Sequence, residues 1–177
     1  MRIALISDTH VPQALPGLPA DLIEKLRGVD RILHAGDLAN LEVLDLLGEI
    51  APTTAVAGNM DPPEVKSQLR DREVFEIAGR TIGLAHGHQP HRLQDRYIRF
   101  DYGAPEFDPF YQTMAAQLPD AEIIVFGHFH RPVIKQWRDI LFVNPGSIAP
   151  PHASPTFAIL ELADDVEVHI VMVDSDR

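Results

Sequence analysis

The sequence predicts an α/β domain with two central sheets and helices on their outer faces. Over the first third of its 177 residues, short apolar runs alternate with amphipathic helical segments. The second half is a series of short strand-like runs with turn residues between them. Polar residues with oxygen or imidazole side chains follow several of these runs, and ligands gather beyond the carboxyl ends of strands in open α/β sheets. We therefore expect the site at one edge of the sheets.

The first third predicts three strands and two helices. Strands are expected at residues 3–6, 31–33 and 53–57, and helices at residues 21–27 and 41–47. The first helix places Leu22, Ile23 and Leu26 on one face. Asn40 is a suitable N-cap for the second helix. Strands that alternate with helices pair in parallel and carry the helices on their outer faces.

The second half predicts a more antiparallel sheet that packs against the first. Residues 73–77 and 81–85 flank Gly79 and Arg80 and form a predicted hairpin. Further strands are expected at residues 122–126, 133–137, 140–143, 157–162 and 166–173. In the last of these, alternate apolar residues share one face, namely Val166, Val168, Ile170 and Met172.

The segment at about residues 89–119 matches neither pattern. It combines arginines with aromatic residues, and only residues 110–117 have helical character. Long irregular segments are uncommon in compact domains unless they act as lids or binding loops. Two interpretations stay open, a surface excursion that packs its own aromatic side chains and a substrate lid in which Arg92 reaches a phosphate. We treat residues 1–177 as a single domain with this segment as an insertion or lid.

Length and composition are typical of a soluble protein with one continuous core. Hydrophobic residues make up 45% of the chain and charged residues 23%. There is no cysteine, which excludes disulfides and thiolate metal ligands. No apolar stretch approaches the roughly 20 residues that span a bilayer, and the N-terminal strand leads into candidate ligands rather than a cleavage site. We expect a cytoplasmic protein that does not bind membranes.

The formal net charge of -11 argues against general nucleic-acid affinity, because such affinity needs clustered lysines and arginines. Two bound divalent cations would offset four of these charges, so a local site could still attract a small phosphorylated substrate. No pattern in the sequence specifies the oligomeric state.

Five short polar motifs each follow an apolar run. They contain the residues Asp8 with His10, Asp37, Asn59, His86, and His128 with His130. Oxygen and imidazole ligands suit borderline divalent metals. In an extended segment, residues two apart point the same way, so Asp8 with His10 could reach one metal. Each motif alone is weak, since a single histidine after a strand is more often a hydrogen-bonded loop residue, but the five together indicate a metal-dependent hydrolase.

Three other polar residues are expected to support the site. His34 ends a strand shortly before Asp37, so we expect it to orient the following loop by hydrogen bonding. Ser7 and Ser147 lie at a strand end and in a turn, and we interpret them as structural rather than catalytic.

In combination the motifs resemble those of a known family. Their order is Asp8-Thr9-His10, Gly36-Asp37, Gly58-Asn59-Met60-Asp61, His86-Gly87-His88 and Gly127-His128-Phe129-His130. The sequence resembles the calcineurin-like metallophosphoesterases, and within them the small bacterial and archaeal phosphodiesterase group related to the retromer subunit Vps29. The resemblance runs from residue 1 to about residue 147, where the turn at residues 144–147 also fits. It implies a four-layer α/β/β/α sandwich with two metals at one edge of the sheets.

The resemblance also implies two ligand sets. One metal would be held by Asp8, His10, Asp37 and His130, and the other by Asp37, Asn59, His86 and His128. Two ions about 3.5 to 4 Å apart can share a hydroxide and align it for in-line attack on phosphorus. The implied activity is a dinuclear phosphodiesterase that uses Mn, Ni, Fe or Zn, with Asp37, Asn59 and His128 also counted as catalytic.

Met60 departs from the family pattern. Many relatives have a histidine after the asparagine ligand that helps to protonate the leaving group, and a thioether cannot donate a proton. Asp61 or His88 could replace it, with a contribution of about 10²- to 10⁴-fold for general acid catalysis. Alternatively, the enzyme could favour substrates with good leaving groups.

Other functions stay open beside the phosphodiesterase. The same chemistry would suit a phosphomonoesterase or a nucleotide pyrophosphatase. A Vps29-like protein could instead act as a non-catalytic interaction scaffold. Scaffolds tend to lose histidine ligands, and this chain keeps all seven candidate ligands. We therefore expect an enzyme.

Overall fold

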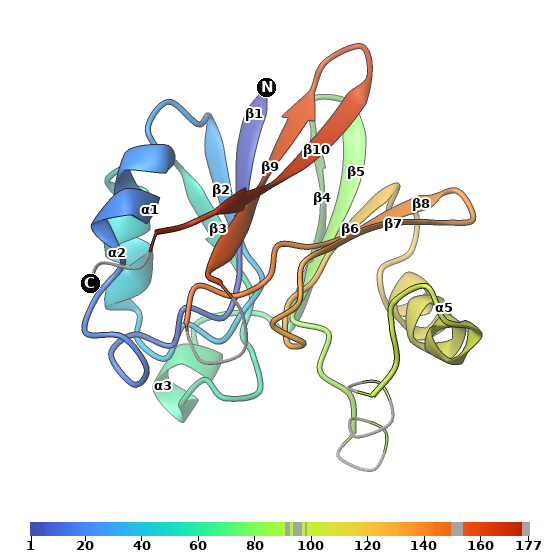
Figure 1. Ribbon diagram of the computed structural model, residues 1–177, viewed down its shortest axis with the longest axis horizontal. Helices are drawn as coiled ribbons and strands as arrows, with labels where there is room; N and C mark the ends of the chain where they lie inside the picture. The colour runs from blue at the N-terminus through green and yellow to red at the C-terminus, as the bar shows by residue number, and fades with distance from the viewer. Residues whose placement is uncertain (91–92, 94–96, 98, 150–153, 175–177) are drawn as a thin grey trace.

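The computed structural model describes residues 1–90, 93, 97, 99–149 and 154–174. Within these residues, two five-stranded sheets pack face to face with helices on both outer sides (Figure 1). The strand order is β10-β9-β1-β2-β3 in the first sheet and β4-β5-β6-β8-β7 in the second. The predicted four-layer α/β/β/α sandwich with two central sheets is confirmed.

The N-terminal strands form the parallel side of the first sheet. There β1 (Arg2–Ile6), β2 (Arg31–His34) and β3 (Thr53–Ala55) pair in parallel. The outer helices α1 (Ala20–Lys25) and α2 (Glu42–Gly48) connect these strands. Ile6 pairs with His34, so β1 and β2 end together at one edge. The loops that follow them carry Asp8 and Asp37.

The second sheet has a parallel centre, which corrects the expectation of a sheet more antiparallel than the first. Its centre consists of β5 (Arg80–Ala85), β6 (Ile123–Val125) and β8 (Ile140–Asn144). The flanking strands β4 (Arg72–Ile77) and β7 (Val133–Trp137) pair antiparallel with β5 and β8. The predicted hairpin is therefore confirmed, and the carboxyl ends of β5 and β6 meet at one edge.

The last two strands belong to the first sheet, and not to the second as the sequence suggested. The antiparallel partner of β1 is β9 (Thr156–Leu162), which also pairs with the edge strand β10 (Val166–Met172). All residues of β9 except Glu161 are buried. A strand buried in this way needs layers on both faces, but its own sequence does not say which sheet it joins. That choice depends on the contact with β1, which is remote in sequence.

Three hydrophobic layers hold the four structural layers together. Along β1, Ala4 and Ile6 pack toward the outer helices, whereas Ile3 and Leu5 pack between the sheets. Along β6, Ile124 packs on the opposite side, in the layer that faces α5 (Asp108–Gln117). Alternate side chains on a strand point to opposite faces. Both central sheets are thus buried on two sides, and polar groups gather at the strand ends.

The aromatic residues of the 89–119 segment build the outermost hydrophobic layer. Tyr102, Phe107, Phe110 and Tyr111 are buried there beside α5 and the 3-10 helix η1 (Pro105–Phe107). The described part of the segment therefore packs against the second sheet. Arg92 lies outside the described residues, and the lid interpretation stays a prediction.

Some local features differ from the sequence expectations. Helix α2 has Leu41 rather than Asn40 at its N-cap, although the Asn40 side chain accepts a hydrogen bond from the Glu42 N–H at 3.1 Å. The one-turn helix α3 (Pro63–Lys66) was not predicted, because four residues give too little periodicity. In the described part of the chain, no helix has the length and apolar character needed to cross a membrane.

Candidate metal centre

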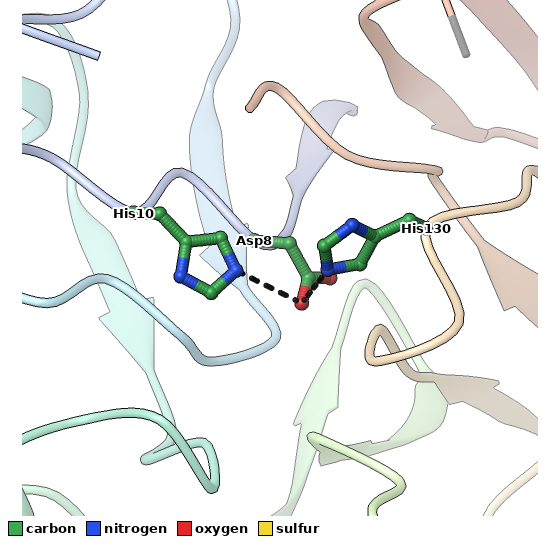
Figure 2. A group of neighbouring side chains, drawn as sticks. All are labelled: Asp8, His10 and His130. Carbon is green, nitrogen blue, oxygen red and sulfur yellow. Dashed lines mark ion pairs between the residues drawn. The ribbon is translucent and has the colours of Figure 1, made fainter. Parts of the chain in front are cut away.

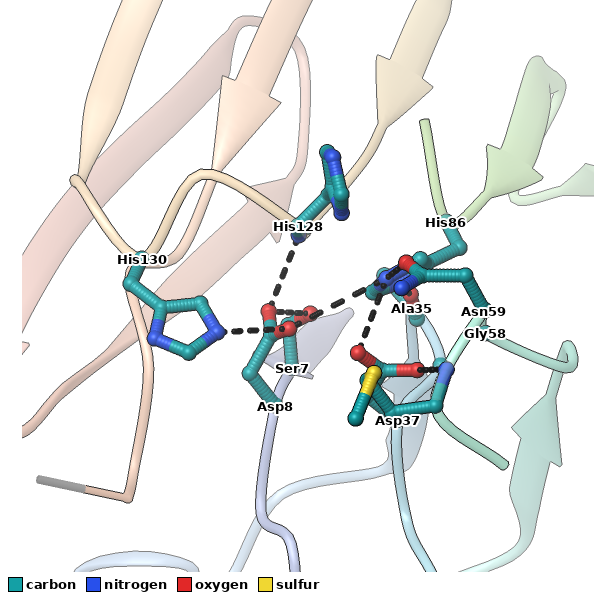
Figure 3. A network of polar contacts seen from close by, with 12 residues as sticks. Ser7, Asp8, Ala35, Asp37, Gly58, Asn59, His86, His128 and His130 are labelled. Atoms are coloured by element: carbon teal, nitrogen blue, oxygen red, sulfur yellow. Dashed lines mark hydrogen bonds and ion pairs between the residues drawn. The ribbon is translucent and has the colours of Figure 1, made fainter. Parts of the chain in front are cut away.

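The seven predicted ligands come together at the edge where the strands of both sheets end. They lie in the loops after β1, β2, β3, β5 and β6 and comprise Asp8, His10, Asp37, Asn59, His86, His128 and His130. Figure 3 shows His128 and His130 around Asp8, with His86 and Asn59 beside Asp37. Residues from distant parts of the chain, and from both sheets, therefore form one polar cluster.

Two carboxylates occupy the centre of this cluster. Asp8 Oδ1 lies 3.1 Å from His130 Nε2 and 3.8 Å from His10 Nε2 (Figure 2). It also lies 4.0 Å from His86 Nε2. Asp37 Oδ2 lies 3.2 Å from His86 Nε2 and 3.8 Å from His10 Nε2. His10 is thus equally close to both carboxylates.

In each carboxylate, one oxygen is held by the protein and the other faces the histidines. Asp8 Oδ2 accepts hydrogen bonds from the Ser7 hydroxyl and, at 3.0 Å, from the His128 N–H. Asp37 Oδ1 accepts a hydrogen bond from the Met60 N–H at 2.8 Å. Contacts of this kind fix the orientation of metal ligands. The remaining oxygen of each carboxylate is left to bind a cation.

His86 is oriented in the same manner. Its Nδ1 lies 2.7 Å from the Ala35 carbonyl oxygen, which can only accept, so Nδ1 carries a proton. Once the ring loses its second proton, the other nitrogen has a free lone pair for a cation. That atom, Nε2, lies 3.0 Å from Asn59 Oδ1 and faces Asp37. The Nε2 atom of His86 is thereby presented to the centre of the cluster.

The charges of the cluster favour a cation. Burial alone would lower the pKa of His86, but its hydrogen bond to Asp37 and the charges of Asp8 and Asp37 raise it to about 9. Burial alone would raise the pKa of Asp37, yet His86 and the Met60 N–H bring it down to about 2. Asp37 is thus ionised at neutral pH. Burial alone would raise the pKa of Asp8 too, but its hydrogen bond to His130 and the charge of His86 lower it, so both carboxylates stabilise positive charge beside them.

His128 provides a further sign that the residues fit a metal. Burial, followed by the charge of His86, lowers the pKa of His128 to about 4, so its ring is neutral at pH 7. Its Nε2 atom is buried and has no hydrogen-bond partner among the described residues. Most buried polar side-chain atoms do have a partner. A neutral imidazole nitrogen of this kind is a suitable ligand for a divalent cation.

Two overlapping groups have ligand atoms within 4.8 Å of one another, namely Asp8, His10 and His130, and Asp8, Asp37 and His86. They share Asp8, whereas the family resemblance implied Asp37 as the shared ligand. Since Asp8 Oδ1 and Asp37 Oδ2 both face His10 and His86, the two carboxylates lie in comparable central positions.

Five of the seven predicted ligands have a left-handed backbone. Their φ angles are 54° for Asp8, 46° for His10, 57° for Asp37, 70° for His128 and 53° for His130. This conformation is uncommon for residues other than glycine and costs about 1–3 kcal/mol each. It corrects the expectation that Asp8 and His10 lie in an extended segment. The loops turn sharply instead, which sends His130 toward His10 and His128 toward His86, with ring centroids 5.5 and 5.2 Å apart.

A family model described as the calcineurin-like phosphoesterase superfamily domain matches residues 1–165. The chain belongs to this superfamily. It is 33% identical to a probable metallophosphoesterase of Methanothermobacter thermautotrophicus over 166 residues, which cover 92% of this chain and 86% of that protein. A probable metallophosphoesterase of Methanocaldococcus jannaschii is 32% identical, with coverage of 98% and 82%.

Among solved structures, the fold is similar to that of Vps29 from Entamoeba histolytica in complex with Zn²⁺. The TM-score is 0.71 at 26% identity, and the match covers 97% of this chain and 99% of Vps29. The predicted resemblance to the calcineurin-like family, including its Vps29 branch, is confirmed.

In this chain, Met60 is 58% exposed and its backbone N–H is bound to Asp37. Asp61 is buried, and its carboxylate accepts three backbone N–H groups, from Asp37 at 3.1 Å, Ala39 at 2.7 Å and Gly58 at 2.7 Å. These contacts tie the loops after β2 and β3 together. They argue against the proton-donor role predicted for Asp61, because its oxygens face the backbone.

His88 is the other proton donor that the sequence predicted. It is exposed, and its ring centroid lies 5.7 Å from that of His86 and 6.4 Å from that of His128. Partial burial of its ring against the cluster, together with the charge of His86, lowers its pKa. His88 thus borders the cluster on its solvent side, where a leaving group could reach it.

Sequence reasoning missed the role of one turn next to the cluster. The Asn144 amide donates to the Gly127 carbonyl oxygen at 2.7 Å, and the Ser147 hydroxyl donates to the Asp8 carbonyl oxygen at 3.0 Å. The turn therefore connects the loops that carry Asp8 and His128. The motif was visible at residues 144–147, but its contact with Asp8 spans 139 positions and has no local signal. The prediction for His34 is confirmed, since its Nδ1 accepts the Gly36 N–H at 3.2 Å.

Gly127→Ala is expected to distort the cluster. A Cβ at Gly127 would overlap Ser7 Oγ and would lie 2.7 Å from Asp8 Oδ2. Overpacking of this kind costs about 1–3 kcal/mol, which lowers Tm by roughly 2–4 °C per kcal/mol at this chain length. Thermal denaturation and metal analysis should show lower stability and lower metal content. Gly17→Ala is the control, because nothing lies within 4 Å of a Cβ there. Equal results for both variants would contradict the close packing around Asp8.

Proposed function

We propose that this chain is a metal-dependent phosphodiesterase with two divalent cations in the cluster at the sheet edge. The main support is the arrangement of Asp8 and Asp37. In each carboxylate the protein holds one oxygen by hydrogen bonds, and the other oxygen faces imidazole nitrogens. Carboxylate, amide and imidazole ligands of this kind suit Mn, Fe, Ni or Zn. Two relatives that are about a third identical to this chain are named probable metallophosphoesterases.

The residues that would hold the first cation are Asp8, His10, Asp37 and His130, and those for the second are Asp37, Asn59, His86 and His128. Divalent cations supply charge neutralisation of the phosphoryl oxygens and activation of a water molecule for attack on phosphorus. The chain supplies orientation, because Ala35, Met60 and Ser7 fix the ligand atoms. No serine or other covalent nucleophile is needed for this reaction.

Protonation of the leaving group is the step for which this chain differs from the family pattern. The exposed thioether of Met60 cannot donate a proton. His88 lies outside the proposed ligand sets, beside the rings of His86 and His128, and is the proton donor that we propose. This donor lies on the solvent side of the cluster and contacts few neighbouring residues. We therefore expect the enzyme to prefer substrates whose alcohol leaves readily.

The fold similarity to Vps29 supports a second candidate, a scaffold that binds other proteins. The two candidates differ in a measurable property. An enzyme must use its ligand cluster for turnover, whereas a scaffold needs only an intact surface.

The test is metal-dependent hydrolysis by the purified full chain. Protein stripped with a chelator should be inactive on bis(p-nitrophenyl) phosphate and regain activity with Mn²⁺ or Ni²⁺. p-Nitrophenyl phosphate and nucleotides in the same assay separate a diesterase from a monoesterase or pyrophosphatase. Metal-replete protein that hydrolyses none of these compounds would favour the scaffold.

A further inference from the structure

A small pocket adjoins the metal cluster on the side of His86. It has a volume of about 140 Å³, and its lining includes Asp71, Arg72, His86, His88 and Gln117. Its position follows from the register of the second sheet, in which Arg72 at the start of β4 pairs with Ala85 at the end of β5. Since His86 comes directly after Ala85, one wall of the pocket is a proposed metal ligand.

The outer wall of the pocket comes from two elements. Arg72 begins β4 and Gln117 ends α5, and both side chains are exposed. Neither side chain makes a hydrogen bond or an ion pair with another described residue. A guanidinium group has five N–H donors, and a carboxamide both donates and accepts. The hydrogen-bonding capacity of this wall is therefore open to a bound molecule.

The charge and size of the pocket narrow the choice of ligand. Asp71 and Arg72 carry opposite formal charges, so the wall does not specially attract a second phosphate. A volume of about 140 Å³ corresponds to about four or five water molecules. An uncharged group of a few atoms with hydroxyls matches both properties, whereas a large apolar group matches neither.

We propose that this pocket binds the non-reacting alcohol arm of a phosphodiester, and that this arm carries free hydroxyl groups. The proposal rests on the phosphodiesterase function proposed above. In the reaction, water provides the new oxygen on phosphorus, and the bond to the other alcohol breaks as that alcohol takes a proton. The arm in the pocket stays on the phosphomonoester product. Arg72 and Gln117 would then determine specificity.

Two matched substrates test this proposal, 2,3-dihydroxypropyl p-nitrophenyl phosphate and propyl p-nitrophenyl phosphate. They share the leaving group and differ only in two hydroxyls on the other arm. With Mn²⁺-loaded full chain, we expect kcat/KM to be about fivefold to tenfold higher for the dihydroxypropyl ester, as one or two hydrogen bonds would give. Arg72→Met and Gln117→Leu should bring this ratio to within about twofold of one.

Arg70→Met and Gln112→Leu are the matched controls and should keep the wild-type ratio. Arg70 lies two positions before Arg72 but pairs with Glu73 at 3.6 Å, and Gln112 is an exposed residue of the same helix as Gln117. Equal kcat/KM for both esters in the wild type, or an unchanged ratio in Arg72→Met, would overturn the pocket assignment alone. If the wild-type protein hydrolyses neither ester, both the phosphodiesterase function and the pocket assignment are overturned.

Discussion

Asp37→Asn is expected to lower kcat/KM for bis(p-nitrophenyl) phosphate by on the order of 10³-fold. The amide keeps the size of the side chain and can still accept the Met60 N–H, but it removes the negative charge that faces His86 and His10. Metal ions contribute several kcal/mol of charge stabilisation to phosphoryl transfer, and each 1.36 kcal/mol is tenfold in rate. Steady-state kinetics with saturating Mn²⁺ and metal analysis of the variant measure this effect.

Asp45→Asn is the matched control, because Asp45 is an exposed carboxylate in α2 on the outer face of the first sheet. It removes the same charge far from the cluster and should retain wild-type kinetics. His128→Ala should resemble Asp37→Asn. Wild-type kinetics in Asp37→Asn, with the metal content unchanged, would exclude Asp37 from the site.

Asp61→Ala is expected to destabilise the fold by about 3 kcal/mol or more. The substitution leaves the buried N–H groups of Asp37, Ala39 and Gly58 without their acceptor. Each buried donor that loses its partner costs about 1–3 kcal/mol. Because all three donors lie in the loops that carry Asp37 and Asn59, metal content should fall as well. Urea denaturation and metal analysis of the variant are the measurements.

A proton-donor role for Asp61 would give a different pattern. Loss of a donor leaves stability and metal content as they are, and it slows poor leaving groups more than p-nitrophenolate. Asp45→Ala is the control for the loss of a carboxylate at an exposed position. A stable, metal-replete Asp61→Ala protein with a selective loss of activity on poor leaving groups would restore Asp61 as the donor.

The strands and the candidate ligands were predictable because local patterns encode them. Ile3 and Leu5 lie two residues apart in one short apolar run, and Leu33 lies in another. Asp8 and Asp37 follow these runs within a few residues. The strand bounds agree with the predicted ranges to within two residues. The residue types alone then indicated oxygen and imidazole coordination.

The partner of each strand and the local turns were not predictable in the same way. The place of β9 beside β1 depends on a contact across most of the chain. The left-handed backbone of Asp8 and His130 was not predictable from residue type, because aspartate and histidine adopt it more often than most residues but still uncommonly. Likewise, the hydrogen bonds of Asp61 became visible only when three backbone segments were seen together. These properties belong to the tertiary structure.

The ligand cluster is supplied by both sheets, and this division would link metal supply to folding. Asp8 and Asp37 extend from the first sheet and His86 and His128 from the second, so a cation held among them would add to the apolar contacts and the few hydrogen bonds that join the two halves. By mass action, a cation that binds only the folded chain adds RT ln(1 + [M]/Kd) to the free energy of unfolding. At a free concentration of about 100 times Kd this is about 2.7 kcal/mol. The folded fraction of this chain in a cell would then depend partly on how much free cation the cell maintains.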